Sequence, residues 1–307
     1  MDLGSISVVL LVASIMVSAT PILLAAIGEM VVEKAGVLNL GVEGMMITGA
    51  VVGFAFAVNS GSPMFGFVAA ALAGALLSSA FALLTQFLLS NQVATGLGLT
   101  LVGLGLSSLI GKPYEGIKSP TLPKLDIPIL SDLPVVGRML FSHDIMVYLS
   151  LLLVVCVWAF LKYTRAGLIL RAVGESHDSA HALGYRVVRV RFLAILFGGA
   201  CAGLGGAYLS LVRVPQWTEG MTAGAGWIAL AIVVFASWRA GRILVGAYLF
   251  GGVTVLQLNL QAAGANVPVA LLSASPYLIT ILVLIVISAR GAHGAPASLA
   301  RPFHASS

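Results

Sequence analysis

Long apolar segments alternate with short polar segments along nearly the whole chain. A helix needs about 20 apolar residues to cross the roughly 30 Å of hydrocarbon in a bilayer. Segments of this kind lie at 6–28, 37–57, 64–89, 93–111, 144–162, 192–213, 225–238, 243–262 and 268–289. The segment 225–238 is short for a span, and 37–57 is interrupted by polar residues and glycines. The pattern predicts an all-α, polytopic transmembrane bundle of about eight to ten spans.

Three polar segments separate or follow these spans. Residues 112–143 form a loop of nearly balanced charge, 163–191 carries mainly arginines, and 290–307 is a polar tail. Because Lys and Arg accumulate in cytoplasmic loops, we expect 163–191 and the tail to be cytoplasmic and 112–143 to be external. The N-terminus is then outside and the C-terminus inside, in one membrane domain over 1–307. This orientation leaves few basic residues outside, namely Lys112, Lys118, Lys124, Arg138 and Arg213.

Composition excludes the soluble enzyme classes. Hydrophobic residues make up 59% of the 307 residues, charged residues only 9%, and the mean hydropathy is +1.06. A soluble domain carries about 25% charged residues, and a soluble globule of this size buries only about 75% of its surface. The net charge of +5 is therefore attributed to the cytoplasmic loops of an oriented membrane protein, and nucleic acid is not an expected partner.

The most unusual stretch is GEMVVEKAGVLNLGVEGMMITG, residues 28–49. Its glycines predict a broken helix near 36–44, and irregular backbone at membrane depth is tolerated only inside protein or along a water-filled path. We place Glu29 and Glu33 at the cytoplasmic end of the first span, which makes Glu43 the only carboxylate within the spans. Either Glu43 lies near a solute path, or it caps a broken helix or pairs with a partner subunit; the two readings are evenly balanced.

Further polar side chains lie within the spans. They either form hydrogen bonds between helices or line a path for a polar, uncharged solute, and the first reading is the more common one. Small-residue pairs such as Gly49-x-x-x-Gly53 and Gly199-x-x-x-Gly203 would let helix backbones approach closely. The polar residues concerned are Gln86, Gln92, Thr95, Gln257, Asn259 and Gln261.

The segment 163–191 differs from the other loops. It contains a basic helical entry, a break at 174–176, a short amphipathic turn and then Gly184. Such a short helix suits docking of a soluble partner, although a solvated loop touching lipid headgroups is the alternative. His177 and His181, four residues apart, could hold a metal ion, but no third ligand is evident, so a polar helix face is favoured. The chain also has no phosphate-binding GxxxxGK[ST] loop, so we expect no ATP hydrolysis by the chain itself.

Several sequence blocks then point to one family. The run EKAGVLNLGVEGMMITGA (33–50) resembles the signature of nucleoside and simple-sugar permeases of ATP-binding cassette (ABC) importers, within the branched-chain amino acid and ribose permease superfamily. Segments 165–185, 197–209, 224–238 and 256–288 are similar to further blocks in the same order, so the resemblance covers about 28–290. The VLNLGVEGMM form and the 256–268 block are most similar to purine-nucleoside permeases. The chain departs from the family at 175–177, where Glu-Ser-His replaces Glu-Asn-Pro, and at 180–181, where Ala-His replaces Ala-Ala.

The resemblance implies a division of labour between several subunits. A cytoplasmic ABC ATPase, which uses ATP and Mg²⁺, would dock on the coupling segment, residues 163–191. A second homologous permease would form a heterodimer with this chain, and an external solute-binding lipoprotein would deliver the solute. Together they would make an importer in the bacterial cytoplasmic (inner) membrane. The chain would bind no cofactor or metal and would move solute by alternating access, without covalent chemistry. The expected coupling residues are Gly174, Glu175, Ser176, Ala180, Leu183 and Gly184, and the expected solute-path residues are Asn39, Glu43, Gln92, Thr95, Gln257 and Asn259.

Alternatives remain for the solute and for the class. Within the importer reading, the solute is a nucleoside, with a simple sugar, riboflavin or another small polar molecule as the alternative. An ATP-independent secondary transporter or channel is the rival class. It is disfavoured because proton coupling usually needs a network of buried ionisable groups, and only Glu43 is assigned to the spans. A structural or receptor protein is weaker still, since the chain has no sizeable soluble domain.

Overall fold

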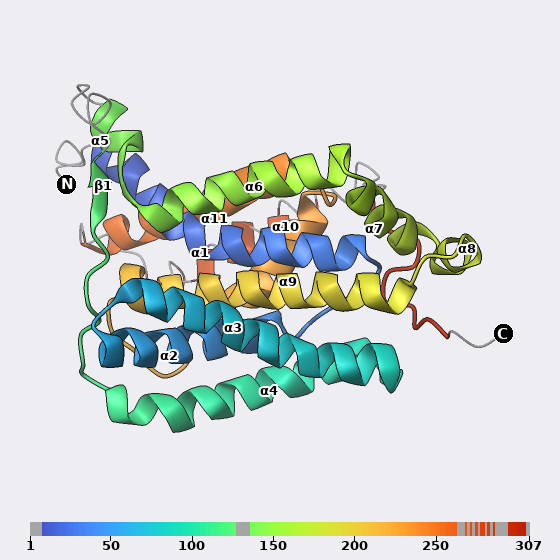
Figure 1. Cartoon of the computed structure of the whole chain (residues 1–307). Coiled ribbons are helices and arrows are strands. Elements are labelled where there is room, and N and C mark those ends of the chain that lie inside the picture. The colour runs from blue at the N-terminus through green and yellow to red at the C-terminus, as the bar shows by residue number, and fades with distance from the viewer. Residues whose placement is uncertain are drawn as a thin grey trace.

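The computed structural model describes residues 8–126, 136–262 and 294–304, together with isolated positions between 268 and 285. Within these residues the chain is almost wholly helical (Figure 1). Two π-helical turns, Leu83–Phe87 and Leu209–Arg213, extend the third and ninth helices, and a 3-10 turn, Lys112–Tyr114, follows the fourth. The helices are α1 (Val8–Lys34), α2 (Val42–Ser60), α3 (Pro63–Ala82), α4 (Gln92–Gly111), α5 (Val136–Leu140), α6 (Ile145–Tyr163), α7 (Arg165–Glu175), α8 (His177–Ala182), α9 (Val187–Tyr208), α10 (Ala225–Phe235) and α11 (Ala240–Ala262).

Seven of the described helices are long and apolar enough to cross a membrane, which confirms the all-α polytopic class. They contain α1, α2, α3, α4, α6, α9 and α11, and each corresponds to one predicted span. The predicted span 225–238 forms the shorter apolar helix α10. The predicted span 268–289 lies largely outside the described residues.

The long helices run roughly side by side, and the polar segments gather at the two ends of the bundle (Figure 1). α7, α8 and residues 294–304 lie at one end. At the other end lie α5, the first turns of α1 and a small antiparallel ribbon of β1 (Lys124–Asp126) and β2 (Ser142–Asp144). The segments predicted to share the cytoplasmic side therefore lie together, and the segment predicted to be external lies opposite them.

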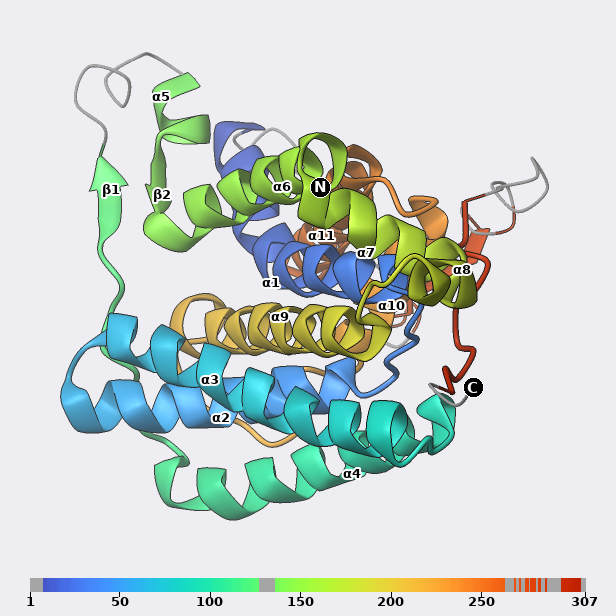
Figure 2. The same ribbon diagram turned by 45° about the vertical axis from the view of Figure 1, so that its right-hand side comes forward.

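α1, α2 and α9 form the centre of the bundle, while α4 and α6 lie at opposite edges (Figures 1 and 2). Close backbone contacts at glycines allow this packing, as the small-residue pairs predict. A Cβ at Gly49 would collide with the backbone of Gly203, and one at Gly74 would collide with Gly199. Because lipid is as apolar as leucine, close packing of this kind is what holds membrane helices together.

The outer helices expose large apolar side chains. Leu72 and Leu76 of α3, Leu101 and Leu109 of α4, and Leu152 of α6 are all exposed. In a water-soluble protein such a surface would aggregate, but in a bilayer it faces lipid at no cost.

The helix break that the sequence predicts near 36–44 is shorter in the structure. α1 continues through Lys34, and α2 begins at Val42, so residues 35–41 form the non-helical segment, called the break below. Gly44 lies inside α2, contrary to expectation. A Cβ there would lie 2.6 Å from the carbonyl oxygen of Leu99, so this glycine lets α4 approach α2 and does not interrupt the helix.

Candidate functional site

Side chains from other helices bind the backbone of the break. The Leu38 N–H donates to Oε1 of Gln92 at 2.8 Å, and the Asn39 N–H donates to Oε1 of Glu29 at 3.3 Å. These two N–H groups have no helical partner, and a buried N–H without one would cost about 1–3 kcal/mol. Gln92 of α4 and Glu29 of α1 therefore make a non-helical backbone possible in the interior of the bundle.

The carbonyl group of Leu40 is held in the same way from the other side. It accepts hydrogen bonds from Oγ1 of Thr100 in α4 at 3.2 Å and from Nε1 of Trp227 in α10 at 3.3 Å. The break is thus bound to α1, α4 and α10, so a shift of any of these helices would displace the backbone of the break.

Asn39 organises the break from within. Its side chain is fully buried; Oδ1 accepts from the Gly41 N–H at 3.0 Å, and Nδ2 donates to Sδ of Met45 at 3.4 Å. Asn39 therefore forms the turn that leads into α2, and in this structure both polar atoms of its side chain are occupied.

Glu43 caps the start of α10. Its Oε1 accepts from Oγ1 of Thr222 at 2.6 Å and from the Gly224 N–H at 2.9 Å, and its Oε2 accepts from the Gly226 N–H at 2.7 Å. A carboxylate is stabilised at a helix N-terminus by free N–H groups and by the helix dipole. A Cβ at Gly226 would lie 2.6 Å from Cα of Glu43. Of the two readings of Glu43, this geometry fits the capping one, with α10 as the helix capped.

The expectation that Glu43 is the only carboxylate in the spans is wrong. α1 continues past Gly28 because residues 29–34 contain neither glycine nor proline, and both Glu29 and Glu33 are 0% exposed within it. Glu33 accepts a hydrogen bond from Nε1 of Trp238. The expected absence of further buried acids therefore no longer argues against a secondary transporter, because the spans contain Glu29 and Glu33 as well as Glu43.

The remaining predicted path residues are spread over two helices. Gln92 contacts the break, whereas Thr95, in the next turn of α4, shares a hydrogen bond of 2.8 Å with Ser90. Gln257 and Asn259 lie toward the end of α11, where Nδ2 of Asn259 donates to the carbonyl oxygen of Val255 in the same helix. The structure thus brings Asn39, Glu43 and Gln92 together around the break, without Thr95, Gln257 or Asn259.

Residues 163–191, the predicted coupling segment, contain two helices, α7 and α8, with a turn between them. Ser176 lies at the turn and caps α8, because its Oγ accepts the Ser179 N–H at 3.3 Å. Ala180 is buried, whereas Glu175 is exposed and Leu183 is 75% exposed. Gly184 has φ +86°, a conformation that side-chain-bearing residues rarely adopt. α8 therefore has one face packed on the protein and one end open to a partner.

The same segment lies against the break. Gly174, the penultimate residue of α7, packs so closely on the backbone that a Cβ would collide with the carbonyl oxygen of Lys34. Gly174 itself is buried. This contact places the end of α7 directly beside the point where α1 stops.

Two of the hollows on the described surface lie close to the long helices. One has a volume of about 430 Å³ and is lined by apolar side chains of α1, α6, α7 and α9. The other, of about 530 Å³, is lined by residues that include Ser18, Lys124 and Asp144. Neither contains a residue of the break, so in this structure the break is closed off from both.

Sequence reasoning missed several residues that hold this arrangement. Trp227, Thr100 and Thr222 act through side-chain hydrogen bonds to residues far away in the sequence, and nothing in their local sequence distinguishes them. Glu29 could have been found, since an acid within an apolar run is rare and usually has a specific role.

Comparison with known proteins identifies the family. Residues 11–288 match the family described as branched-chain amino acid transport system, permease component. The chain is 43% identical over 289 residues to the putative glucose ABC transporter permease protein TsgC13 of Haloferax volcanii, covering 87% of this chain and 88% of the relative.

Two further relatives are bacterial. The guanosine ABC transporter permease protein NupQ of Bacillus subtilis is 31% identical, and the nucleoside ABC transporter permease protein NupC of Lactococcus lactis is 30% identical. Each alignment covers 90% of this chain and 91% of the relative. No solved structure matches the chain. The chain therefore belongs to the branched-chain amino acid transport system permease family, as a multi-pass membrane permease subunit of an ABC transporter and not an ATPase.

Proposed function

We propose that the chain forms the translocation path of an ABC importer and moves a nucleoside or a simple sugar by alternating access. The observation that carries the proposal is the position of α8. This short helix extends beyond the ends of the long helices (Figures 1 and 2), and its Leu183 end is open while its other face packs on the chain. A permease that does not hydrolyse ATP itself needs an exposed surface on which a separate ATPase can dock and transmit its movement.

A cytoplasmic ABC ATPase, which uses ATP and Mg²⁺, is the proposed partner at α8. The residues proposed to form the docking site are Glu175, Ser176, Leu183 and Gly184. Leu183 provides an exposed apolar contact, and Gly184 forms the turn that ends α8. Docking here places α7, α8 and residues 294–304 on the cytoplasmic side and the β1–β2 ribbon outside, in the cytoplasmic membrane of the cell.

Two more partners follow from the same proposal. A second homologous permease, different in sequence from this chain, would complete the pore, and an external solute-binding lipoprotein would deliver the solute to the end that carries the β1–β2 ribbon. The relatives support an ABC assembly, because they are named ABC transporter permeases.

The solute is proposed to be neutral and rich in hydroxyl groups. The relative with 43% identity is named for glucose and the two at about 30% for guanosine and nucleosides. These solutes share a sugar ring. Apart from Glu29 and Arg191, the polar side chains that contact the break are amides, hydroxyls and an indole, and both oxygens of Glu43 are held by hydrogen bonds at the start of α10. A nucleoside remains the solute that the sequence favours, with a simple sugar or riboflavin as the alternatives.

The break is the proposed moving part. It is joined to α4 through Gln92 and Thr100 and to α10 through Trp227. When the ATPase closes and displaces α8, these helices would separate on one side of the break and open it to the solute.

Uptake by the complete transporter tests the proposal. Cells that carry this chain and its partners should take up a labelled nucleoside or sugar, and a panel of unlabelled nucleosides, pentoses, hexoses and flavins identifies the solute by competition. Leu183→Glu, which places a charge on the docking end, should reduce uptake by about tenfold or more. Leu125→Glu is the matched control, since Leu125 is an exposed leucine in β1 at the opposite end of the bundle.

The outcomes separate the importer from its rival. Uptake that persists after the ATPase subunit is removed would favour an ATP-independent transporter. Equal uptake by the Leu183→Glu and parental proteins would overturn docking at α8 while leaving the solute assignment standing.

A further inference from the structure

A buried arginine joins the coupling segment to the break. Arg191, in the first turns of α9, is 0% exposed. Its Nε donates to the carbonyl oxygen of Ala35, the first residue of the break, at 3.1 Å. Gly36 lies against the same guanidinium: its φ is +85°, and a Cβ would lie 2.9 Å from Nη2 of Arg191. The start of the break is therefore fixed to α9 by a charged hydrogen bond.

The other end of the same guanidinium reaches α8. Nη2 of Arg191 donates to Nδ1 of His177 at 3.3 Å. A guanidinium can only donate, so Nδ1 of His177 is the acceptor and the ring carries its proton on Nε2, which faces Asp178 at 3.5 Å. One rigid, planar group thus links the first residue of α8 with the first residue of the break.

Residues 294–304, called the strap below, complete this site. Nη1 of Arg191 donates to the carbonyl oxygen of Arg301 at 3.1 Å, and the Ser298 N–H donates to the carbonyl oxygen of Gly174 at 3.0 Å. Phe303 lies edge-on to both His177 and His181, with ring centroids 5.4 and 5.3 Å apart.

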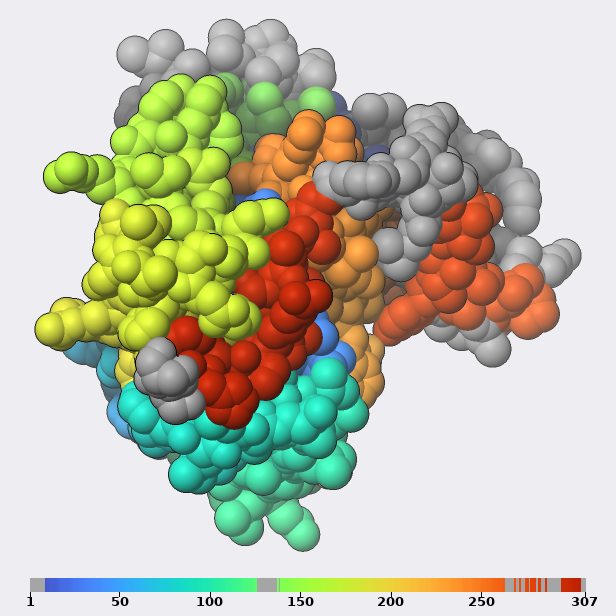
Figure 3. Space-filling view, turned by 90° about the vertical axis from the view of Figure 1, so that its right-hand side faces the viewer, coloured from blue at the N-terminus to red at the C-terminus, as the bar shows by residue number. Residues whose placement is uncertain are grey.

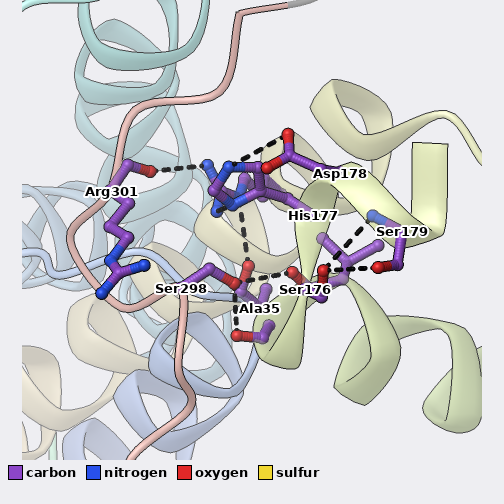
Figure 4. A network of polar contacts seen from close by, with 10 residues as sticks. Ala35, Ser176, His177, Asp178, Ser179, Ser298 and Arg301 are labelled. Carbon is purple, nitrogen blue, oxygen red and sulfur yellow. Dashed lines mark hydrogen bonds and ion pairs between the residues drawn. The ribbon is translucent and has the colours of Figure 1, made fainter. Parts of the chain in front are cut away.

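Figure 4 shows Ala35, His177, Ser298 and Arg301 converging from three parts of the chain, since Ser298 and Arg301 both belong to the strap. Figure 3 shows the strap, in red, lying across the end of the bundle between the yellow-green α7–α8 segment and the teal end of α3 and α4.

We propose that Arg191, held by the strap, is the positioning residue that transmits movement of α8 to the break. This inference rests on the proposed function. α8 has only a short contact with the long helices, so a displacement of α8 alone could be absorbed by bending at Ser176. The three hydrogen bonds of Arg191 and the strap remove that freedom, because His177, Ala35, Arg301 and Gly174 are then parts of one hydrogen-bonded unit.

The geometry requires arginine. Three acceptors in different directions are met by Nε, Nη1 and Nη2 of one planar group, whereas a lysine ammonium at the end of a flexible stem cannot hold the same three positions. Arg189 differs only in its surroundings. It lies two residues earlier in the same helix and is exposed, so it provides a matched control for charge and helix position.

The experiment compares Arg191→Lys and Arg191→Gln with Arg189→Lys and Arg189→Gln in the complete transporter, reconstituted in lipid vesicles. ATP hydrolysis and solute uptake are measured together. We expect the two Arg191 variants to bind and stimulate the ATPase normally but to transport about tenfold less solute per ATP. The maximal uptake rate should fall while the solute concentration for half-maximal uptake stays unchanged. Both Arg189 variants should behave like the parental protein.

A second variant covers the case in which Arg191 variants fail to fold. Ser298→Ala removes the hydrogen bonds that Oγ of Ser298 donates to the carbonyl oxygens of Val173 and Gly174. Combined with Phe303→Ala it loosens the strap and leaves Arg191 in place, and it should give a smaller fall in solute moved per ATP. The inference would be overturned if the Arg191 variants moved as much solute per ATP as the parental protein. If the Arg191 variants do not accumulate in cells, the same result in the double strap variant would overturn it. Absence of transport by the parental protein would instead contradict the proposed function.

Discussion

Glu43 illustrates how one charged side chain can be both costly and structural. A buried carboxylate is tolerated in a membrane protein when hydrogen-bond donors surround it, and here the donors come from a hydroxyl and two backbone N–H groups at the start of α10. Glu43 is only 3% exposed. The joint between α2 and α10 therefore depends on a charge that no neighbouring cation neutralises among the described contacts.

Glu43→Gln should test whether this joint is the main role of the residue. The amide can accept through one oxygen only, and its NH₂ group would face an N–H donor, so we expect a loss of about 1.5–3 kcal/mol in the free energy of unfolding. The measurement is the unfolding midpoint of the detergent-solubilised protein. Thr222→Val, which removes one donor, should cost about 1 kcal/mol. Unchanged stability of Glu43→Gln together with lost uptake would instead place Glu43 in the solute path.

At the scale of elements, the sequence predicts local features and misses distant ones. Run lengths of apolar residues and the position of Gly36 locate the helices and the break, because helix formation and helix breaking depend on neighbouring residues. The partners of the break lie far away: Leu38 and Gln92 are 54 residues apart, and Leu40 and Trp227 are 187 residues apart. Only the packing of the helices decides such pairs, and hydropathy does not encode it.

The coupling segment shows the same limit. Its two helices and its closing glycine follow from its sequence, but Arg191 resembles the other arginines beside it. Burial distinguishes Arg191 from Arg189, and one acceptor of the buried guanidinium is the carbonyl oxygen of Arg301 in the strap, 110 residues further along the chain.

The contact between α8 and α9 should depend on pH through His177. Burial, and after it the charge of Arg191, lower the pKa of His177 below its ordinary value near 6.5. The carboxylate of Asp178 raises this pKa, and the charge of Arg301 lowers it further. The neutral ring is the acceptor for Arg191. Because the packed state binds its proton less well than the released state, packing loses stability as the pH falls below about 6.5.

Hydrogen–deuterium exchange of the peptide that covers 176–184 checks this dependence. After correction for the intrinsic effect of pH on exchange, its protection should fall between about pH 7 and pH 5, while peptides of α6 keep theirs. His177→Asn retains an acceptor near the position of Nδ1 but does not titrate, so its protection should not change over this range. A fall of the same size in His177→Asn would rule out His177 as the titrating group.

At the scale of the whole molecule, polar segments are confined to two ends and apolar side chains cover the sides between them (Figure 1). The positive-inside rule predicts that the end with α7 and α8 is cytoplasmic, because this end carries the arginines of 163–191. The proposed docking of an ATPase at α8 depends on this prediction.

Single cysteines measure the orientation directly. In a Cys156→Ala background, in which Cys201 stays buried, Leu125→Cys should react with a membrane-impermeant thiol reagent on intact cells. Leu183→Cys should react only after the membrane is made permeable. Both leucines are exposed, so the side of the membrane and not burial determines the result. The reverse labelling pattern would invert the topology and exclude docking of a cytoplasmic ATPase at α8.

The strap has a consequence for the order in which the protein is made. During translation, α7, α8 and α9 enter the membrane well before residues 294–304 are synthesised. Until then Arg191 lacks the carbonyl oxygen of Arg301 as an acceptor, and the carbonyl oxygen of Gly174 lacks the N–H of Ser298 as a donor. A chain cut short before the strap would lack these two contacts. In the proposed importer, only permease translated through the strap would then present a complete docking surface to the ATPase.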